Sequence, residues 1–396
     1  MTAPLDGLVV VTVEQALAAP LATRHLADLG ARVIKVERPG DGDFARRYDD
    51  ALGPGFSSWF VWLNRGKESV ALDVKSDEGN RLLHRLVARA DVFVQNLAPG
   101  AAARLGCEHD ELRARHPGLV TCSISGYGDD GPYRDRRAYD LLVQAESGLL
   151  SLTGPPEEAA KAGVSVVDIA GGMYAYSGIL AALLQRARTG TGSHVSVALF
   201  DAMVEWLSHQ VIFTQARGEA PARSGAHHAS IAPYGPYRCR DGNDVVIAVQ
   251  NTREWGSLCS VLGLPELAQD PRFATNELRV QAGESLRLLL GRRIGELTSA
   301  ELVDLLEAGK LAWSQVNGMR EVVDHPQLAA RDRWIPAMGG IGGVGGVRTV
   351  RPPVDITGVD RPIGAVPRLG EHTDAVLAWL ASDEASEPAS EARSPV

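Results

Sequence analysis

The first part of the chain alternates short β-branched runs with helix-like segments, and this alternation most constrains the fold. Residues 7–13 (GLVVVTV) are typical of a buried strand, residues 19–30 have helical spacing, and residues 31–37 (ARVIKVE) predict a second strand. Two strands joined by a helical crossover run parallel. We therefore predict an α/β fold built on a parallel sheet.

The alternation continues to about residue 216. Further strands are predicted at 69–76, 91–97 and 119–128, and helices at 77–90, 101–106, 109–117 and 140–152. Residues 164–167 are predicted to be extended and to lead into an apolar helix over 173–188. Residues 193–216 predict a strand that runs into another long helix.

A chain of 396 residues is too long for one ordinary core, so we expect two domains. The composition changes near residue 217, where Gly, Ala, Pro and Ser predict a linker. A hairpin around Asp241 and Gly242 and then helices over 253–330 should form a smaller α+β domain. Beyond residue 331 we expect an extended pair, a short helix at 372–381 and a frayed tail.

Composition and motif searches exclude several classes of function. The net charge of −9 disfavours nucleic acid as a partner, and the four cysteines form no CxxC pair, which favours a reducing cytoplasm. We find no signal peptide and no apolar run of the ~18 residues that a membrane span needs. The histidines are scattered, so no metal is expected. GIGGVGG (340–346) precedes an extended segment rather than a helix, so we interpret it as a hairpin tip and not as a dinucleotide fingerprint.

One carboxylate stands out in VSVVDIAGGMYA (164–175), because Asp168 lies between a predicted strand and a helix. A helix cap is the simpler interpretation of an Asp in this position. However, ligands of parallel sheets collect at the carboxyl ends of strands, and Gly171 and Gly172 would leave backbone N–H groups open to a ligand. An accessible carboxylate can attack an acyl group and form an anhydride.

Several segments together resemble the class III CoA-transferases, a group that includes formyl-CoA transferase, carnitine CoA-transferase and α-methylacyl-CoA racemase. They are PLDGLVVV, LGARVIKVERPGDGD, NRGKESVALDVKSDEG, DVFVQNLAPGAAARLG, SISGYGDDGPY, YDLLVQAESGL, VVDIAGGMYA and TGTGSHVSVALFDA. The resemblance implies a Rossmann-like large domain built from both chain ends (1–216 and 331–396), a smaller domain inserted at 217–330, and an interlocked homodimer. It also implies that Asp168 forms a mixed anhydride and then an aspartyl-CoA thioester, with no metal or separate cofactor.

The resemblance also implies a set of CoA-binding residues. They are Ala18, Arg38, Leu72, Lys75, Asn96, Leu97, Arg104 and Arg137. Local cations suit the phosphates of CoA on an acidic protein. For a single member such as Arg104 a solvated surface charge explains the residue equally well, and Asn96 could be a turn residue.

Within this family the racemases are the alternative function. They pair the aspartate with a His-Asp step, whereas here Tyr139 precedes Asp140, so a transferase is favoured. Asp140 either positions Asp168 or caps a helix. A non-catalytic CoA-binding protein remains an alternative of another class, and an NAD-linked enzyme is disfavoured because VEQALAAP replaces the glycine fingerprint.

The acceptor acid is predicted from HHASIAPYGPY, which resembles the branch of the family that acts on succinate, mesaconate, citramalate or itaconate. His228, Tyr234 and Arg223 are the candidates for binding a distal carboxylate. An ordered domain linker in which Tyr234 packs is the competing interpretation.

Overall fold

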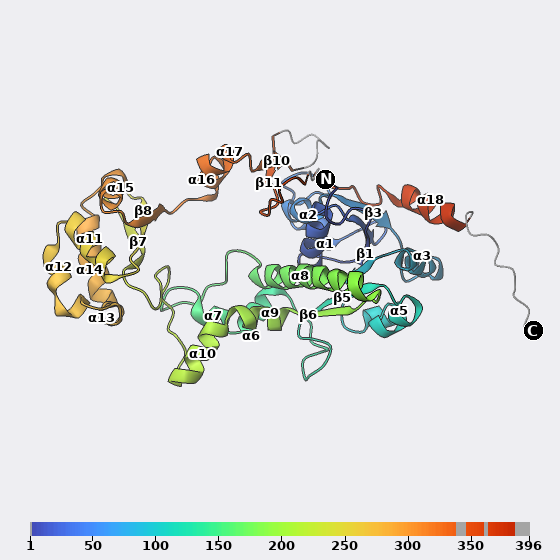
Figure 1. Cartoon of the computed structure of the whole chain (residues 1–396), viewed down its shortest axis with the longest axis horizontal. Coiled ribbons are helices and arrows are strands. Elements are labelled where there is room, and N and C mark those ends of the chain that lie inside the picture. The colour runs from blue at the N-terminus through green and yellow to red at the C-terminus, as the bar shows by residue number, and fades with distance from the viewer. Residues whose placement is uncertain (1, 338–345, 360–362, 385–396) are drawn as a thin grey trace, which may run out of the picture. The chain divides into compact units, whose positions relative to one another are not determined.

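The computed structural model describes residues 2–337, 346–359 and 363–384 (Figure 1). The glycine run assigned to a hairpin tip therefore lies outside the described residues, apart from Gly346. Contacts within the chain define two compact units. The first takes the chain up to Ser147, Gly163–Leu207 and the residues from Asp332 onward, and the second takes Gly148–Ala162 and Ser208–Arg331.

These bounds differ from those expected from the composition. The change of unit falls at Ser208 rather than at residue 217, because the predicted long helix is two helices, α9 (Leu199–Trp206) and α10 (Ser208–Arg217). The helix predicted at 140–152 is also two helices, α6 (Asp140–Glu146) and α7 (Leu149–Leu152). Gly148 between them has a φ of 88°, a left-handed conformation that ends α6.

The first unit contains a six-stranded sheet in which every neighbouring pair is parallel, in the order β3-β2-β1-β4-β5-β6. The strands are β1 (Val9–Val13), β2 (Arg32–Glu37), β3 (Lys67–Ala71), β4 (Val92–Gln95), β5 (Val120–Ser125) and β6 (His194–Ala198). The predicted α/β fold with a parallel sheet is thus confirmed. Strand order reverses between β1 and β4, and in parallel sheets such a reversal opens a crevice at the carboxyl ends of the strands.

Helices of the first unit cover this sheet (Figure 1). They are α1 (Ala18–Asp28), the short 3-10 helix η1 (Phe44–Arg47), α2 (Ser58–Asn64), α3 (Asp77–Ala88), α4 (Ala101–Arg104), α5 (His109–Arg115), α6, α8 (Val166–Thr189), α9 and α18 (Thr373–Glu384). From the end of the chain, α18 inserts Val376 and Leu380 into the core that β1, β2 and α3 share. A short antiparallel pair, β10 (Trp334–Pro336) and β11 (Arg348–Val350), precedes α18.

The start of α8 corrects the sequence prediction for residues 164–167. No strand precedes Asp168, because α8 begins at Val166 and Asp168 lies in its first turn. Gly171 and Gly172 lie inside the helix, where backbone N–H groups bond to the preceding turn and are not open to a ligand. Their role is close packing: a Cβ on Gly172 would come 2.6 Å from the carbonyl oxygen of Ala18 in α1.

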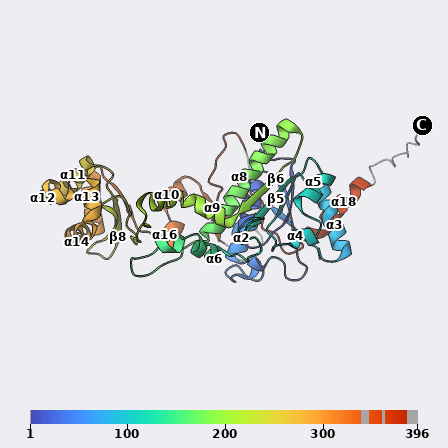
Figure 2. The ribbon, with the colours of Figure 1, turned by 90° about the horizontal axis from the view of Figure 1, so that it is seen from below.

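By length and composition, α8 is also the one described helix that could cross a membrane, contrary to the expectation that no apolar run is long enough. It packs instead against α1, α9 and strands β5 and β6, as Figure 2 shows for the last three. The core helix of a soluble protein has these properties. The four cysteines are all buried and free.

A network of buried charges lies under the carboxyl end of β1. Glu14 accepts hydrogen bonds from Lys67 Nζ (2.6 Å) and Lys35 Nζ (3.4 Å), and Lys35 also bonds Asp43 at 2.8 Å. Thr23 completes the coordination of Glu14 at 2.7 Å. Burial lowers the pKa of Lys67 to about 7, against the opposing effect of Glu14. Buried charges are tolerated only when they are paired in this way.

The second unit packs helices against a three-stranded antiparallel sheet of β7 (Tyr234–Arg238), β8 (Asp244–Ala248) and β9 (Ala312–Gln315). β7 and β8 form the predicted hairpin, whereas β9 falls in a stretch predicted to be helical. The helices are α7, α10, α11 (Thr252–Val261), α12 (Pro265–Gln269), η2 (Pro271–Phe273), α13 (Asn276–Gln281), α14 (Gly283–Ile294), α15 (Ser299–Ala308), α16 (Met319–Val323) and α17 (Pro326–Ala330). The buried core of this unit surrounds Trp255 and Phe273.

Candidate active site

Asp168 and Asp140 lie together at the start of α8. Asp140 Oδ1 accepts hydrogen bonds from the backbone N–H groups of Val167 (2.9 Å) and Asp168 (3.3 Å). The side chain of Ser165, which precedes the helix, makes no capping bond. Asp140 therefore both caps α8 from a different helix and positions Asp168, and Gln144 Nε2 fixes its second oxygen at 2.5 Å.

The environment of Asp168 raises its pKa from 3.8 to about 7, first through burial and then through the negative charge of Asp140. Among the described residues none donates a hydrogen bond to the Asp168 carboxylate. A carboxylate that is neither solvated nor hydrogen-bonded is a stronger nucleophile than one in water, and a pKa near 7 leaves a large ionised fraction at neutral pH.

An apolar and aromatic cluster beside Asp168 accounts for this burial. Ile169 packs against a cluster formed by Leu17, Leu21, Leu63, Trp59 and Trp62. Tyr48 meets the Trp59 ring edge-on at 6.1 Å. Burial raises the pKa of Tyr48 to about 12, and the charges of Asp43 and Asp168 add to this effect, so the phenol lies within electrostatic reach of Asp168.

Tyr48 was not predicted as a site residue, because nothing in its neighbourhood in the sequence (RRYDD) indicates a role. The predicted Tyr139 precedes α6 and is 63% exposed, and it also contributes to the raised pKa of Tyr48. Tyr48 is 49% exposed. Two solvent-accessible phenols thus lie near the carboxylate, where a substrate could contact them.

The loop after β1 is held in an unusual conformation at the point where the strand order reverses. Asn96 accepts a hydrogen bond from Gln15 N (2.9 Å) and donates one to Gln15 O (2.8 Å), which joins the ends of β1 and β4. The next residue, Ala16, has a φ of 64°, and its N–H bonds Asp43 Oδ1 at 3.1 Å. A non-glycine residue in this conformation costs of order 1 kcal/mol or more, and such strain often marks a functional site.

All eight predicted CoA-binding residues belong to the first unit and follow strands of the parallel sheet. Ala18 begins α1 after β1, and Arg38 follows β2. Leu72 and Lys75 lie beyond β3, which ends at Ala71, and Asn96, Leu97 and Arg104 lie beyond β4, which ends at Gln95. Arg137 is in the loop between β5 and α6. Leu72, Asn96 and Leu97 are thus not strand residues as predicted, but the parallel topology places the set at the carboxyl-end edge of the sheet.

The four cations of this set are available for a ligand. Arg38, Lys75, Arg104 and Arg137 are exposed, and none forms an ion pair with a residue that the structure describes. Other arginines of the same unit do pair, for example Arg32 with Glu68 and Arg47 with Asp41. In this set Asn96 is the member with a demonstrated structural role, as the bridge between strand ends.

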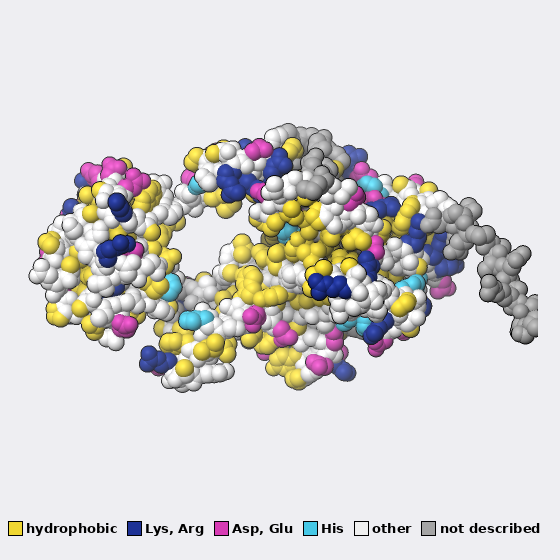
Figure 3. All heavy atoms as spheres, in the orientation of Figure 1, with side chains coloured by type: hydrophobic (Ala, Val, Ile, Leu, Met, Phe, Trp, Pro, Cys, Tyr) yellow, Lys and Arg dark blue, Asp and Glu magenta, His cyan; other side chains and the backbone are white. Residues whose placement is uncertain are grey.

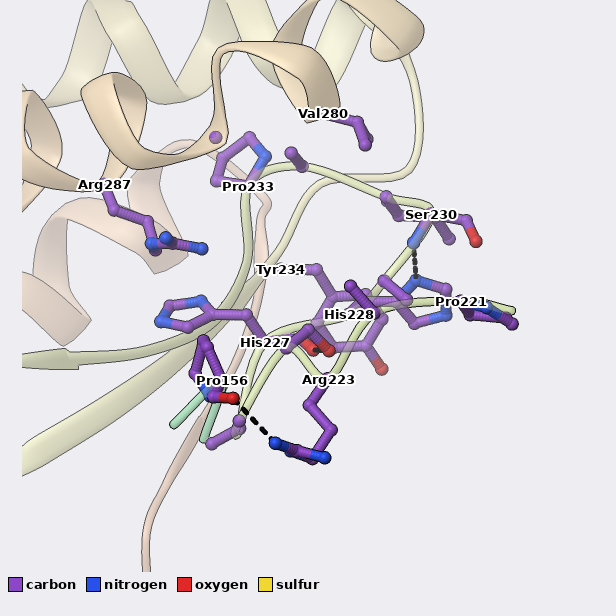
Figure 4. Close-up of a pocket in the computed structure, with 18 of the residues that line it drawn as sticks. Pro156, Pro221, Arg223, His227, His228, Ser230, Pro233, Tyr234, Val280 and Arg287 are labelled. Carbon is purple, nitrogen blue, oxygen red and sulfur yellow. Dashed lines mark hydrogen bonds between the residues drawn. The ribbon is translucent and has the colours of Figure 1, made fainter. Parts of the chain in front are cut away.

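The residues predicted to bind an acid lie in the second unit, around a cavity of about 620 Å³ (Figure 4). The ring of His228 stacks on Tyr234, with centroids 5.2 Å apart, and its Nδ1 accepts a bond from Ser230 N. Arg223 donates to the carbonyl oxygens of Pro155 and Pro156. In the described part of the chain no group of three or more His, Cys, Asp or Glu side chains is placed to hold a metal ion.

Comparison with known proteins agrees with this arrangement of the sheet and its edge. Residues 5–373 match the family described as CoA-transferase family III. An acetyl-CoA:oxalate CoA-transferase of Acetobacter aceti is 37% identical over 96% of this chain and 97% of its own length. The succinyl-CoA:glutarate CoA-transferase of Mus musculus is 38% identical over 82% of this chain and 74% of its own.

A solved structure shares the architecture. The crystal structure of a CAIB/BAIF family protein from Brucella suis has a TM-score of 0.84 and 38% sequence identity, over 96% of this chain and all of that one. The resemblance drawn from the sequence motifs is therefore confirmed, and the protein is an enzyme of CoA-transferase family III.

Proposed function

We propose that the enzyme transfers CoA from an acyl-CoA to a dicarboxylic acid, with Asp168 as the nucleophile. The observation that carries this proposal is the environment of the Asp168 carboxylate, which is partly buried, accepts no hydrogen bond from a described residue and has a pKa of about 7. The oxalate and glutarate named for the two relatives are both dicarboxylic acids, which supports this class of acceptor.

The proposed cycle conserves every group. Asp168 attacks the donor thioester, a C–O bond forms, the C–S bond breaks, and CoA leaves as a thiolate. The thiolate attacks the aspartyl carbonyl of the anhydride, which releases the donor carboxylate and leaves an aspartyl-CoA thioester. The acceptor carboxylate displaces CoA from this thioester, and the thiolate then attacks the acceptor carbonyl, which regenerates Asp168.

Residues of the first unit would support these steps. The exposed cations Arg38, Lys75, Arg104 and Arg137 would bind the phosphates of CoA. Asp140 would fix the start of α8, and with it the reacting carboxyl, while its charge keeps Asp168 basic enough to attack. Proton exchange at an α-carbon lacks a partner base, because Tyr139 stands where the racemases have a histidine.

Mass spectrometry of the intact protein tests the nucleophile. The enzyme would be incubated with succinyl-CoA or another acyl-CoA and quenched with hydroxylamine or borohydride, and the peptide containing Asp168 would be mapped. A mass change at Asp168 that Asp168→Asn abolishes supports the cycle. Solvent deuterium at the α-carbon without a protein adduct would indicate a racemase, and CoA binding with neither signal would indicate a non-catalytic binder.

We also propose that the protein is a homodimer. Apolar side chains gather on the exposed face of α8 (Figure 3), where Met173, Tyr174 and Leu184 are 36%, 38% and 57% exposed. Trp206 of α9 is 47% exposed. Large exposed apolar groups of this kind are usual where a second chain binds. Light scattering should give twice the chain mass of 42.2 kDa, and a monomer at micromolar concentration would contradict this proposal.

A further inference from the structure

The cavity of the second unit has a second polar wall, separate from the predicted His228 and Tyr234. This wall consists of His227, Tyr237 and Arg287, which come from the loop before β7, from β7 itself and from α14 (Figure 4). The cavity lining is cationic: Arg223 and Arg287 contribute guanidinium groups, and Glu157 is the sole carboxylate among its described residues.

Tyr237 carries a hydrogen-bond donor that the protein leaves unused. Its side chain is 5% exposed, and its hydroxyl has no hydrogen-bond partner among the residues that the structure describes. A buried polar group of this kind is uncommon and destabilises the free protein. Burial raises the pKa of Tyr237, so the phenol stays protonated and can donate to an acceptor oxygen of a ligand.

Arg287 supplies a positive charge beside this hydroxyl. Its charge acts on both Tyr237 and His227, and it forms no ion pair in the described part of the chain. In Figure 4 its guanidinium extends from α14 toward the His227 ring. Arg223 differs, because its guanidinium already donates to two backbone carbonyls.

His227 is fixed in place by the backbone of β7. Its ring meets Tyr237 edge-on, with centroids 5.9 Å apart. A Cβ on Gly235 would come 2.1 Å from His227 Nδ1, so the glycine of the PYGPY segment makes room for this ring. Burial and then Arg287 lower the pKa of His227, so the imidazole is neutral at pH 7 and can donate or accept a hydrogen bond.

We propose that His227, Tyr237 and Arg287 bind the free carboxylate of a dicarboxylic acid, an inference that rests on the function proposed above. One carboxylate oxygen accepts from the Tyr237 hydroxyl, and the guanidinium of Arg287 neutralises the charge. The stacked pair of His228 and Tyr234 then forms an apolar and aromatic side of the cavity rather than its anion-binding group. This site narrows the acceptor to acids with a second carboxylate.

Calorimetric titration with glutarate and, separately, with CoA tests this site in the full-length protein. Tyr237→Phe removes only the hydroxyl, and Arg287→Gln removes the charge. Arg292→Gln is the matched control, because it removes the same charge from an exposed position of α14 that does not line the cavity. Because a hydrogen bond to a charged group is strong, each site variant should raise the Kd for glutarate about tenfold, with Arg292→Gln unchanged.

The outcomes are distinguishable. Tyr237→Phe should melt at the wild-type temperature or above it, because the lost hydroxyl had no partner, so weaker binding cannot be attributed to unfolding. Wild-type affinity for glutarate in both site variants would overturn the proposal, as would a loss of affinity for CoA instead of glutarate. If Asp168 forms no adduct but the two variants still weaken glutarate binding, the function proposed above fails and the carboxylate site stands.

Discussion

Replacing Asp168 by Asn should stabilise the protein while it abolishes CoA transfer. The carboxyl is destabilised in the folded state by burial and by Asp140, which raise its pKa from 3.8 to about 7. One pKa unit corresponds to about 1.36 kcal/mol, so the full rise amounts to ~4 kcal/mol. Because water still reaches this partly buried group, about 2 kcal/mol is the expected gain above pH 7.

The pH dependence has a definite sign. Above pH 7 Asp168 is ionised in both the folded and the unfolded state, and the folded state bears the whole cost. Between pH 7 and pH 4 the folded state binds a proton that the unfolded state does not, so the cost decreases as the pH falls. The gain from Asp168→Asn should therefore be about 2 kcal/mol at pH 8 and below about 1 kcal/mol at pH 5.

Urea denaturation of both proteins, followed by tryptophan fluorescence at pH 5 and pH 8, measures this difference. Asp201→Asn is the control, since Asp201 is an exposed carboxyl on α9. A variant no more stable than the wild type at pH 8, or one with the same gain at both pH values, would show that Asp168 is not destabilised in the folded protein.

Three further substitutions have definite expected outcomes. Asp140→Asn keeps the capping oxygen but loses the charge, so the acid limb of the kcat/KM profile, set near pH 7 by Asp168, should move to lower pH; an unmoved limb would exclude electrostatic coupling between the two carboxyls. Glu14→Gln leaves two buried lysines short of a partner and should lower the free energy of unfolding by about 3–5 kcal/mol, whereas a loss below 1 kcal/mol in urea denaturation would show that the network relaxes. Gly172→Ala forces a methyl group against the carbonyl at the start of α1 and should cost about 1–3 kcal/mol and weaken CoA binding. Gly171→Ala meets a flexible leucine side chain and should cost less; the reverse order in thermal denaturation would be evidence against the packing argument.

The sequence predicted the features that depend on near neighbours. The β-branched runs and helical spacings of the first 130 residues identified β1 to β5 and the helices between them to within a few residues, because strand and helix periods are local properties. Several CoA-binding candidates also lie at one edge of the sheet, as the alternation of strands and helices implied. The family could be recognised because its motifs recur in a fixed order.

Residues 164–167 show where local reasoning fails. Val164, Val166 and Val167 have the β-branched character of a strand, yet α8 begins at Val166. The acceptor that satisfies its first N–H groups is the carboxylate of Asp140, and no local pattern records a cap that comes from a residue so far away in the chain. β9 was missed for a similar reason, since its pairing with β8 is a long-range contact.

The sequence by itself thus determined the α/β class, the family and the identity of the candidate nucleophile, because these depend on local periods and on motifs. Only the tertiary structure decided the surroundings that give Asp168 its chemistry: the adjacent Asp140, the phenol of Tyr48 and the Asn96 bridge at the strand ends. It also brought together Tyr237 and Arg287, which lie on different elements. Burial and charge–charge distances arise from packing of segments that are distant in the chain, and residue types alone do not encode them.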